Sequence, residues 1–180
     1  FRYASKNNLN IARIQSLRKA VPGALMVVPF RNPVQHAFSL LSQHLNFLRM
    51  HRDDEFSRIY MRGVGHFDFG ANFKPIDFGG WLDSVPPSGR QPTQLSYWLR
   101  YWIAAYRHVL DHQDPAVRLV SYEGLCEQSS NSLSELGEFL GVSPRALRDR
   151  AAVLKRMEFR QVDCSGVEAG LIDESMVLHE

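Results

Sequence analysis

The stretch ALMVVPF at residues 24–30, followed by RNP at residues 31–33, decides the fold of this chain. Seven apolar residues in succession are typical of a strand covered on both faces, as in a parallel sheet. The proline that follows suits the first turn of a helix, where its missing N–H costs nothing. That helix is predicted to run from Val34 to about Leu48. A strand leading directly into a helix indicates an α/β protein.

The rest of the chain repeats this alternation of strands and helices. A strand is expected at Val117–Ser121, and helices are expected at Leu9–Ala20, Gln94–His112, Asn131–Leu140 and from Ser143 to about Met157. Such alternation predicts a parallel-sheet core with flanking helices. Residues 50–94, rich in Gly, Pro and aromatics, are expected to mix short helices with ordered loops. A segment of that length inside a compact domain is more often functional than idle, so it is interpreted as a substrate-side insert.

Composition narrows the class of protein. The 180 residues carry a net charge of +2, which is too small an excess to predict nucleic-acid binding. No apolar run is long enough for a membrane span. Cys126 and Cys164 are too few for a disulfide framework and are expected to be free thiols, which favours a cytoplasmic location. The chain is read as one domain, residues 1–180, incomplete at its N-terminus and at its C-terminus.

An anion site is predicted where the first strand ends. Arg31 leaves the strand just before a helix whose first N–H groups are unpaired, and an Arg fork beside such groups binds phosphate or sulfate. Ser39 follows about two helical turns later and offers a hydroxyl to the same anion. A plainer interpretation stays open, in which Arg31 makes a solvated salt bridge at the sheet edge and Ser39 only packs.

Four segments in order resemble the sulfotransferase family. They are a predicted strand end that carries Lys6 with the helix after it, the Arg31–Ser39 segment, Tyr122–Leu125, and the Phe-Leu-Gly within Glu138–Val142. The resemblance implies a phosphate-loop-nucleotide-hydrolase-like fold and the co-substrate 3′-phosphoadenosine 5′-phosphosulfate. In that family the Arg and the Ser hold the 3′-phosphate, which assigns those roles to Arg31 and Ser39. By the same resemblance Tyr122 contacts the adenine.

Two family features are missing from the sequence. No Gly-rich loop with a following Lys and Ser/Thr occurs in the 180 residues, so the 5′-phosphosulfate end of the site is expected to lie outside this chain. The family's C-terminal Arg-Lys-Gly stretch is not recognisable either, and its positive charge is assigned to Lys155, Arg156 or Arg160. The chain alone is expected to be inactive.

The chemistry expected is transfer of a sulfuryl group to a hydroxyl or amine of a small molecule or glycan. Lys6 is predicted to stabilise negative charge on the moving group, and His66 to act as the base, oriented by Asp68. An ordinary solvated Lys6 and a structural His66 are the alternatives. No metal is expected, since His108 and His112 at i, i+4 lack an obvious third ligand.

Two other classes of protein stay open. A nucleotide kinase of related fold also places cations at strand ends, but it would depend on magnesium. A non-catalytic binding module would use residues 50–94 for a partner and keep a vestigial nucleotide site.

Overall fold

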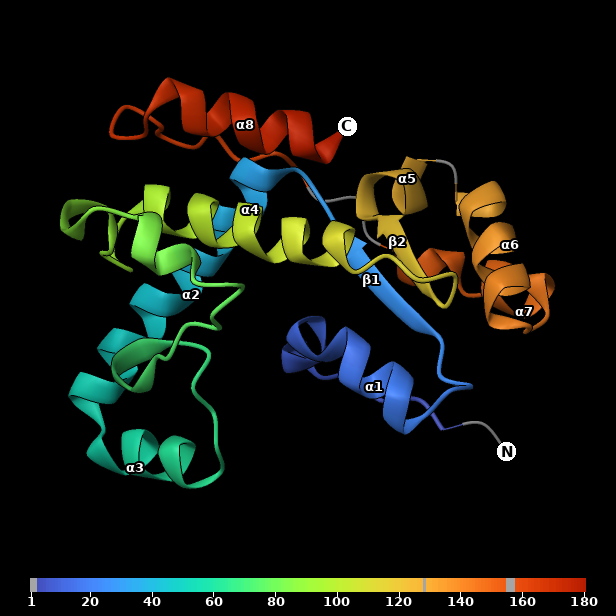
Figure 1. Ribbon diagram of the computed structural model, residues 1–180, viewed down its shortest axis with the longest axis horizontal. Helices are drawn as coiled ribbons and strands as arrows, with labels where there is room; N and C mark the ends of the chain where they lie inside the picture. Colours follow the sequence, from blue (N-terminus) through green and yellow to red (C-terminus); the bar gives the residue numbers. More distant parts are fainter. Residues whose placement is uncertain (1–2, 128, 155–157) are drawn as a thin grey trace. The chain divides into compact units, whose positions relative to one another are not determined.

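The computed structural model describes residues 3–127, 129–154 and 158–180 and is a mixed α/β structure, mostly helical, with a small parallel sheet (Figure 1). The chain divides into two compact units. The sheet unit comprises Phe1–Asn32 and Asp111–Arg160, and the helical unit comprises Pro33–Leu110 and Gln161–Glu180. The α/β expectation is therefore confirmed at this coarse level.

In its described residues, the sheet unit contains two strands, β1 (Met26–Phe30) and β2 (Val117–Ser121), which pair in parallel. The register runs from Met26 opposite Val117 to Phe30 opposite Ser121. Both predicted strands are confirmed, and β2 has its predicted bounds. The expectation that β1 is covered on both faces is wrong. Its side chains alternate across the strand, and Val27 remains 37% exposed.

The residues before β1 form a 3₁₀ turn, η1 (Asn8–Arg13), that continues into α1 (Ile14–Ala20). Asn7 begins this helix by accepting the Leu9 N–H at 2.9 Å, so the predicted helix is confirmed in place. Arg18 on α1 pairs with Asp114 at 3.1 Å, just before β2. This ion pair ties α1 to the start of the second strand.

The helices after β2 are α5 (Tyr122–Glu127), α6 (Ser129–Leu140), α7 (Pro144–Arg148) and the short turn η5 (Ala151–Val153). Gly141 ends α6 with φ +58°, a conformation that favours glycine, as the sequence predicted. The helix expected from Ser143 to Met157 is wrong, because α7 stops at Arg148. Val153 is 72% exposed, so a longer helix would have no apolar face to bury there.

The helical unit is built on α2 (Pro33–Asp53) and α4 (Leu95–Asp111), joined by α3 (Glu55–Gly63) and the short turns η2 (Gly70–Asn72), η3 (Trp81–Ser84) and η4 (Pro87–Gly89). The expected mixture of short helices and loops between residues 50 and 94 is confirmed. α2 runs five residues beyond its predicted end. At that end His51 is buried and accepts the Ala71 N–H at 3.1 Å, which gives the last turn a partner.

The core of the helical unit is aromatic. Tyr97 and Trp98 on α4 are 2% and 1% exposed, and rings from the loops pack against them. The last helix, α8 (Ala169–His179), returns to this unit and is held by ion pairs Arg100–Glu168 at 2.9 Å and Arg107–Glu174 at 2.7 Å. The aromatic side chains along α4 therefore belong to the core of this unit.

Within the described ranges, no helix combines the length and the apolar character that crossing a bilayer requires.

Candidate functional site at the strand exits

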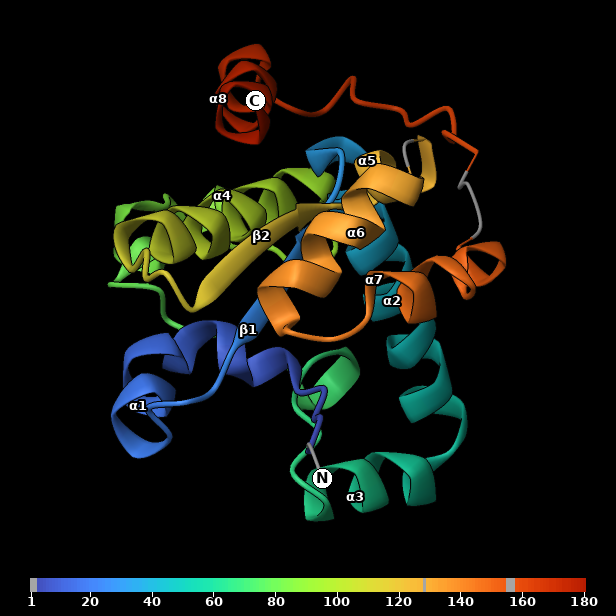
Figure 2. The same ribbon diagram turned by 90° about the vertical axis from the view of Figure 1, so that its right-hand side faces the viewer.

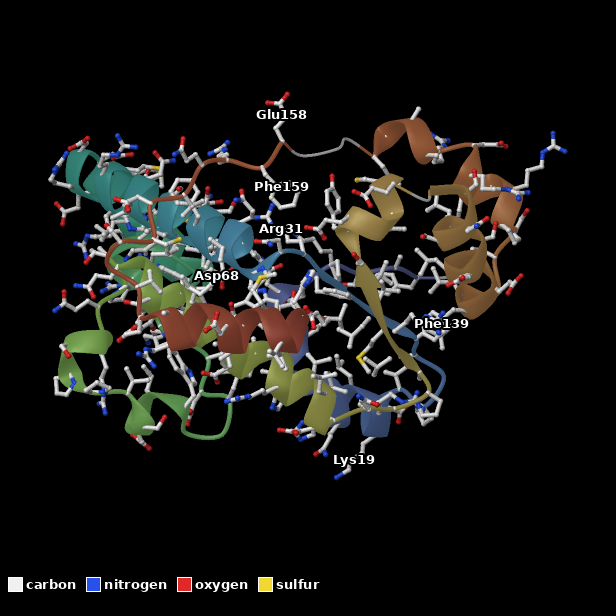
Figure 3. The ribbon with its side chains drawn as sticks, turned by 90° about the horizontal axis from the view of Figure 1, so that it is seen from above. Lys19, Arg31, Asp68, Phe139, Glu158 and Phe159 are labelled. Carbon is white, nitrogen blue, oxygen red and sulfur yellow. The ribbon has the colours of Figure 1, made fainter. Side chains whose placement is uncertain are left out.

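The candidate site of the sheet unit lies where β1 and β2 end. Because the strands are parallel and Phe30 lies opposite Ser121, Arg31 and Tyr122 are the first residues after two neighbouring strands. Figure 3 shows Arg31 at the end of β1. The carboxyl edge of a parallel sheet is where open α/β proteins bind their ligands. Two segments that lie about ninety residues apart in sequence are thus brought to one edge.

Hydrogen bonds hold the two strand exits together. The Asn32 N–H donates to Glu123 Oε1 at 2.8 Å, which joins the loop after β1 to the first turn of α5. The Gly124 N–H donates to Ser121 Oγ at 3.1 Å and fixes the start of that helix. The second carboxylate oxygen, Glu123 Oε2, is buried without a hydrogen-bond partner. The edge therefore contains a fixed loop and one buried acceptor left unsatisfied.

The electrostatics of this edge link Arg31 to Tyr122. Burial raises the pKa of the Tyr122 phenol, and a hydrogen bond with the Cys126 thiol adds to the effect. The Arg31 guanidinium acts in the opposite direction and favours the ionised phenol. The positive charge of Arg31 is therefore within electrostatic reach of the Tyr122 side chain, and the edge presents a cation next to an aromatic ring.

Ser39, the other residue expected to hold the anion, lies on α2 and is exposed. Helix α2 belongs to the helical unit, whereas Arg31 and Tyr122 belong to the sheet unit. A shared anion site of Ser39 and Arg31 therefore stays a prediction.

Lys6 lies in the sheet unit but not at the end of a strand. Residues 3–7 form no regular secondary structure, and Lys6 is exposed just before the Asn7 cap of η1. The expected strand end at Lys6 is therefore wrong. Asn7 instead directs the backbone into the 3₁₀ turn, while the charge-stabilising role of Lys6 stays a prediction.

His66 lies in the helical unit, where its imidazole is exposed and stacks on Phe47 at 6.2 Å between ring centroids. The expectation that Asp68 orients this imidazole is wrong, because no hydrogen bond joins the two residues in the described structure. Asp68 (labelled in Figure 3) instead acts on Tyr101, whose pKa is raised first by burial and also by the Asp68 charge. The base role of His66 stays a prediction.

Residues considered for a metal do not converge. Across residues 3–127, 129–154 and 158–180, no three His, Cys, Asp or Glu side chains gather as a metal site would require. His108 packs on the ring of Phe78 at 5.4 Å. Of the basic residues assigned to the C-terminal anion contact, Arg160 is exposed, and Lys155 and Arg156 lie outside the described residues.

Glu123 is the residue of this edge that the sequence reasoning did not single out. The feature of the sequence that could have identified Glu123 is its position directly after Tyr122, where a carboxylate can accept a hydrogen bond from an N–H of the neighbouring loop. A cleft of about 370 Å³ lies beside the edge, between β2, α5 and α6. Ser121 and Gly124 line it near the strand exit, and the ion pair Arg118–Glu135, at 3.5 Å, crosses from β2 to α6.

No known protein family, characterised protein or solved structure matches this chain in the three comparisons made.

Proposed function

We propose that this chain is part of a sulfotransferase, and that its strand exits hold the 3′-phosphate and adenine end of 3′-phosphoadenosine 5′-phosphosulfate. The observation that carries the proposal is the parallel register of β1 and β2, which makes Arg31 and Tyr122 neighbours at one sheet edge. A ligand that carries both a phosphate and an adenine can bind through a cation and an aromatic ring that lie side by side, here Arg31 and Tyr122. The overall fold proposed is a partial phosphate-loop-like one.

The residues of the edge fit the ligand in charge and shape. Arg31 offers a planar fork of donors, which suits a phosphate dianion in two-point contact. Tyr122 presents a ring beside the cation, and burial raises the pKa of its phenol. Glu123 acts as a positioning residue, since its Oε1 holds the Asn32 backbone that carries the Arg31 loop. Only Oε1 of this carboxylate is occupied by the Asn32 N–H, while Oε2 has no hydrogen-bond partner among the described residues.

The chemistry that follows is an in-line displacement. The acceptor oxygen or nitrogen forms a bond to sulfur while the bond from sulfur to the 5′-phosphate oxygen breaks, and the acceptor's proton passes to a base. Lys6 is proposed to stabilise charge on the transferring group, and His66 to take the proton. Ser39 is proposed as the second ligand of the 3′-phosphate. The acceptor class is a small molecule or glycan that carries a hydroxyl or amine.

The experiment is titration calorimetry of the chain with adenosine 3′,5′-bisphosphate, for the wild type, Arg31→Ala and the control Arg118→Ala. Loss of a charge-assisted two-point contact costs about 1.5–3 kcal/mol, a decrease in affinity of roughly 10- to 150-fold for Arg31→Ala. Arg118 is a matched control because it lies on β2 in the same unit, is half-exposed and loses the same charge. Its variant should bind within about threefold of the wild type, because surface charge acts weakly at a distance.

Three results would contradict the proposal. Equal affinity of the wild type and Arg31→Ala would remove the anion site from the strand exit. A wild-type chain that binds no adenosine bisphosphate would favour the binding-module alternative. Binding that requires magnesium would instead favour the kinase alternative.

A further inference from the structure

Helix α3 of the helical unit turns its apolar side chains away from the protein. Phe56, Ile59 and Tyr60 of α3 and Val64, which directly follows the helix, are 73%, 50%, 58% and 59% exposed. Their spacing of three and four residues places them on one helical face. The side chains on the opposite face are the more polar set Ser57, Arg58 and Met61, which are half-buried. The apolar face of this helix therefore points to solvent and its other face points toward the protein, which is the reverse of an ordinary surface helix.

Specific contacts fix this orientation. Asp54 caps the helix by accepting the Phe56 N–H at 3.0 Å and a bond from the Ser57 hydroxyl. Asn72 Nδ2 donates to the Arg58 carbonyl at 2.7 Å and anchors the helix to η2. Figures 1 and 2 show α3 leaving the end of α2 at a sharp angle. The outward apolar face is thus held by a cap, an anchor and a bend rather than by chance packing.

The exposed rings contact each other instead of a core. The Phe56 and Tyr60 rings stack at 6.1 Å between centroids with 21° between their planes. A ring pair of this kind on the surface is typical of interaction sites, where aromatic residues are enriched. The face is one helix wide.

Charges at the two ends of α3 indicate what covers it. Glu55 begins the helix and Arg62 lies near its end; seven residues, or nearly two turns, separate them, so both lie on the same flank of the apolar face. Both side chains are exposed, and Glu55 also forms an ion pair with Arg58 of its own helix at 3.0 Å. If a second α3 lies antiparallel against the first, Glu55 of each copy meets Arg62 of the other. The face is therefore complementary to itself in charge as well as in apolar character.

We propose that α3 is a self-association surface, in which two copies of this chain pair antiparallel through Phe56, Ile59, Tyr60 and Val64. A two-fold axis makes such a contact isologous and closed, so it yields dimers and not filaments. A membrane surface suits the patch less well. Residues 52–64 carry the carboxylates Asp53, Asp54 and Glu55 and an equal number of arginines, Arg52, Arg58 and Arg62, so the patch lacks the basic excess that anionic lipid attracts.

The association is weak because one short helix from each copy is smaller than a standard interface. We expect a dissociation constant on the order of micromolar or higher. Sedimentation equilibrium of the full 180-residue chain over a wide range of concentrations measures it. Phe56→Ser combined with Tyr60→Ser removes the stacked rings and should leave a monomer at every concentration. Val177→Ser is the control, because Val177 is 74% exposed on α8 and outside the face.

Charge reversal gives the sharper test. Glu55→Arg alone and Arg62→Glu alone each place like charges together at both symmetry-related positions, so each should weaken dimerisation by roughly tenfold or more. The double variant Glu55→Arg/Arg62→Glu exchanges the two ends and should return to within about threefold of the wild type. If the single variants acted only by destabilising α3, the double variant would carry both destabilising changes and would dimerise more weakly than either. Recovery therefore excludes that explanation. Circular dichroism verifies that all variants are folded.

Three outcomes would overturn the proposal. A wild-type chain that is monomeric throughout would do so, whether or not it binds vesicles or another protein. Failure of the double variant to recover would exclude the antiparallel arrangement. A dimer that Val177→Ser weakens as much as Phe56→Ser/Tyr60→Ser would place the contact elsewhere.

Discussion

The sheet unit and the helical unit differ in what their interiors are made of. The helical unit surrounds α4 with aromatic rings, and Trp98 and Leu99 are at most 1% exposed. The sheet unit has small or isolated buried side chains, such as Ile14, Ala116 and Leu133, beside a strand whose alternate residues reach solvent. The candidate ligand groups Arg31 and Tyr122 belong to this second, sparser unit. The dense aromatic core and the proposed Arg31–Tyr122 edge therefore lie in different units of the chain.

Replacing Trp98 with alanine should have the largest effect on stability, and this effect should be confined to the helical unit. Its ring centroid lies within 6 Å of those of five aromatic neighbours, so removing it leaves a large cavity; they are His44, Phe69, Phe73, Tyr97 and Tyr101. We expect a loss of about 3–5 kcal/mol in the free energy of unfolding of the helical unit. Urea denaturation followed by Trp fluorescence and circular dichroism measures it. A loss below about 1 kcal/mol would show that the aromatic cluster is not the core.

Gly70→Ala tests the close approach between α2 and η2. A Cβ at Gly70 would lie 2.7 Å from His51 Nδ1, and the residue has φ +73°, a region that costs other residues about 1 kcal/mol or more. We expect a total cost of roughly 2–4 kcal/mol because strain and clash combine. Gly65→Ala is the matched control. Gly65 has φ +76° but nothing within 4 Å, so its variant should lose only the strain. Equal losses would mean that the His51 contact contributes nothing.

Glu123→Ala should have the smallest effect on stability and be confined to the sheet unit. It leaves the Asn32 N–H without its carboxylate acceptor, which costs about 1–3 kcal/mol if the group stays buried. Glu123→Gln keeps an oxygen for that N–H and should bind adenosine 3′,5′-bisphosphate more tightly than Glu123→Ala. Amide hydrogen exchange should show faster exchange near Asn32 and unchanged protection in α4. Equal binding by the two variants would remove the positioning role of Glu123.

The sequence predicted the strands and the long helices because their signals are local. The apolar run before Arg31 and the run at Val117–Ser121 needed only their own residues and a partner strand. The position of Arg31 at the carboxyl edge followed from the strand–helix pattern, whereas Tyr122 came only from the resemblance to the sulfotransferase family. The contacts across that edge could be found only in the structure, above all the hydrogen bond from the Asn32 N–H to Glu123.

The failures have a common cause. His66 and Asp68 are two residues apart, which suggested that they form a pair. In the structure the His66 imidazole instead stacks on Phe47, and the Asp68 charge raises the pKa of Tyr101. The outward face of α3 was invisible for a similar reason. An amphipathic pattern does not say which side meets the core, and the cap and anchor contacts that decide it come from Asp54 and Asn72.

The return of α8 to the helical unit has a consequence for the order of synthesis. Leu171 and Ser175 are 5% and 0% exposed, so this helix is a wall of the unit and not an appendage. Residues 111–160 of the sheet unit leave the ribosome before it does. The aromatic core around α4 must therefore wait, partly uncovered, for more than fifty residues of translation. During that interval the nascent chain would be a natural client for chaperones that hold exposed aromatic surface.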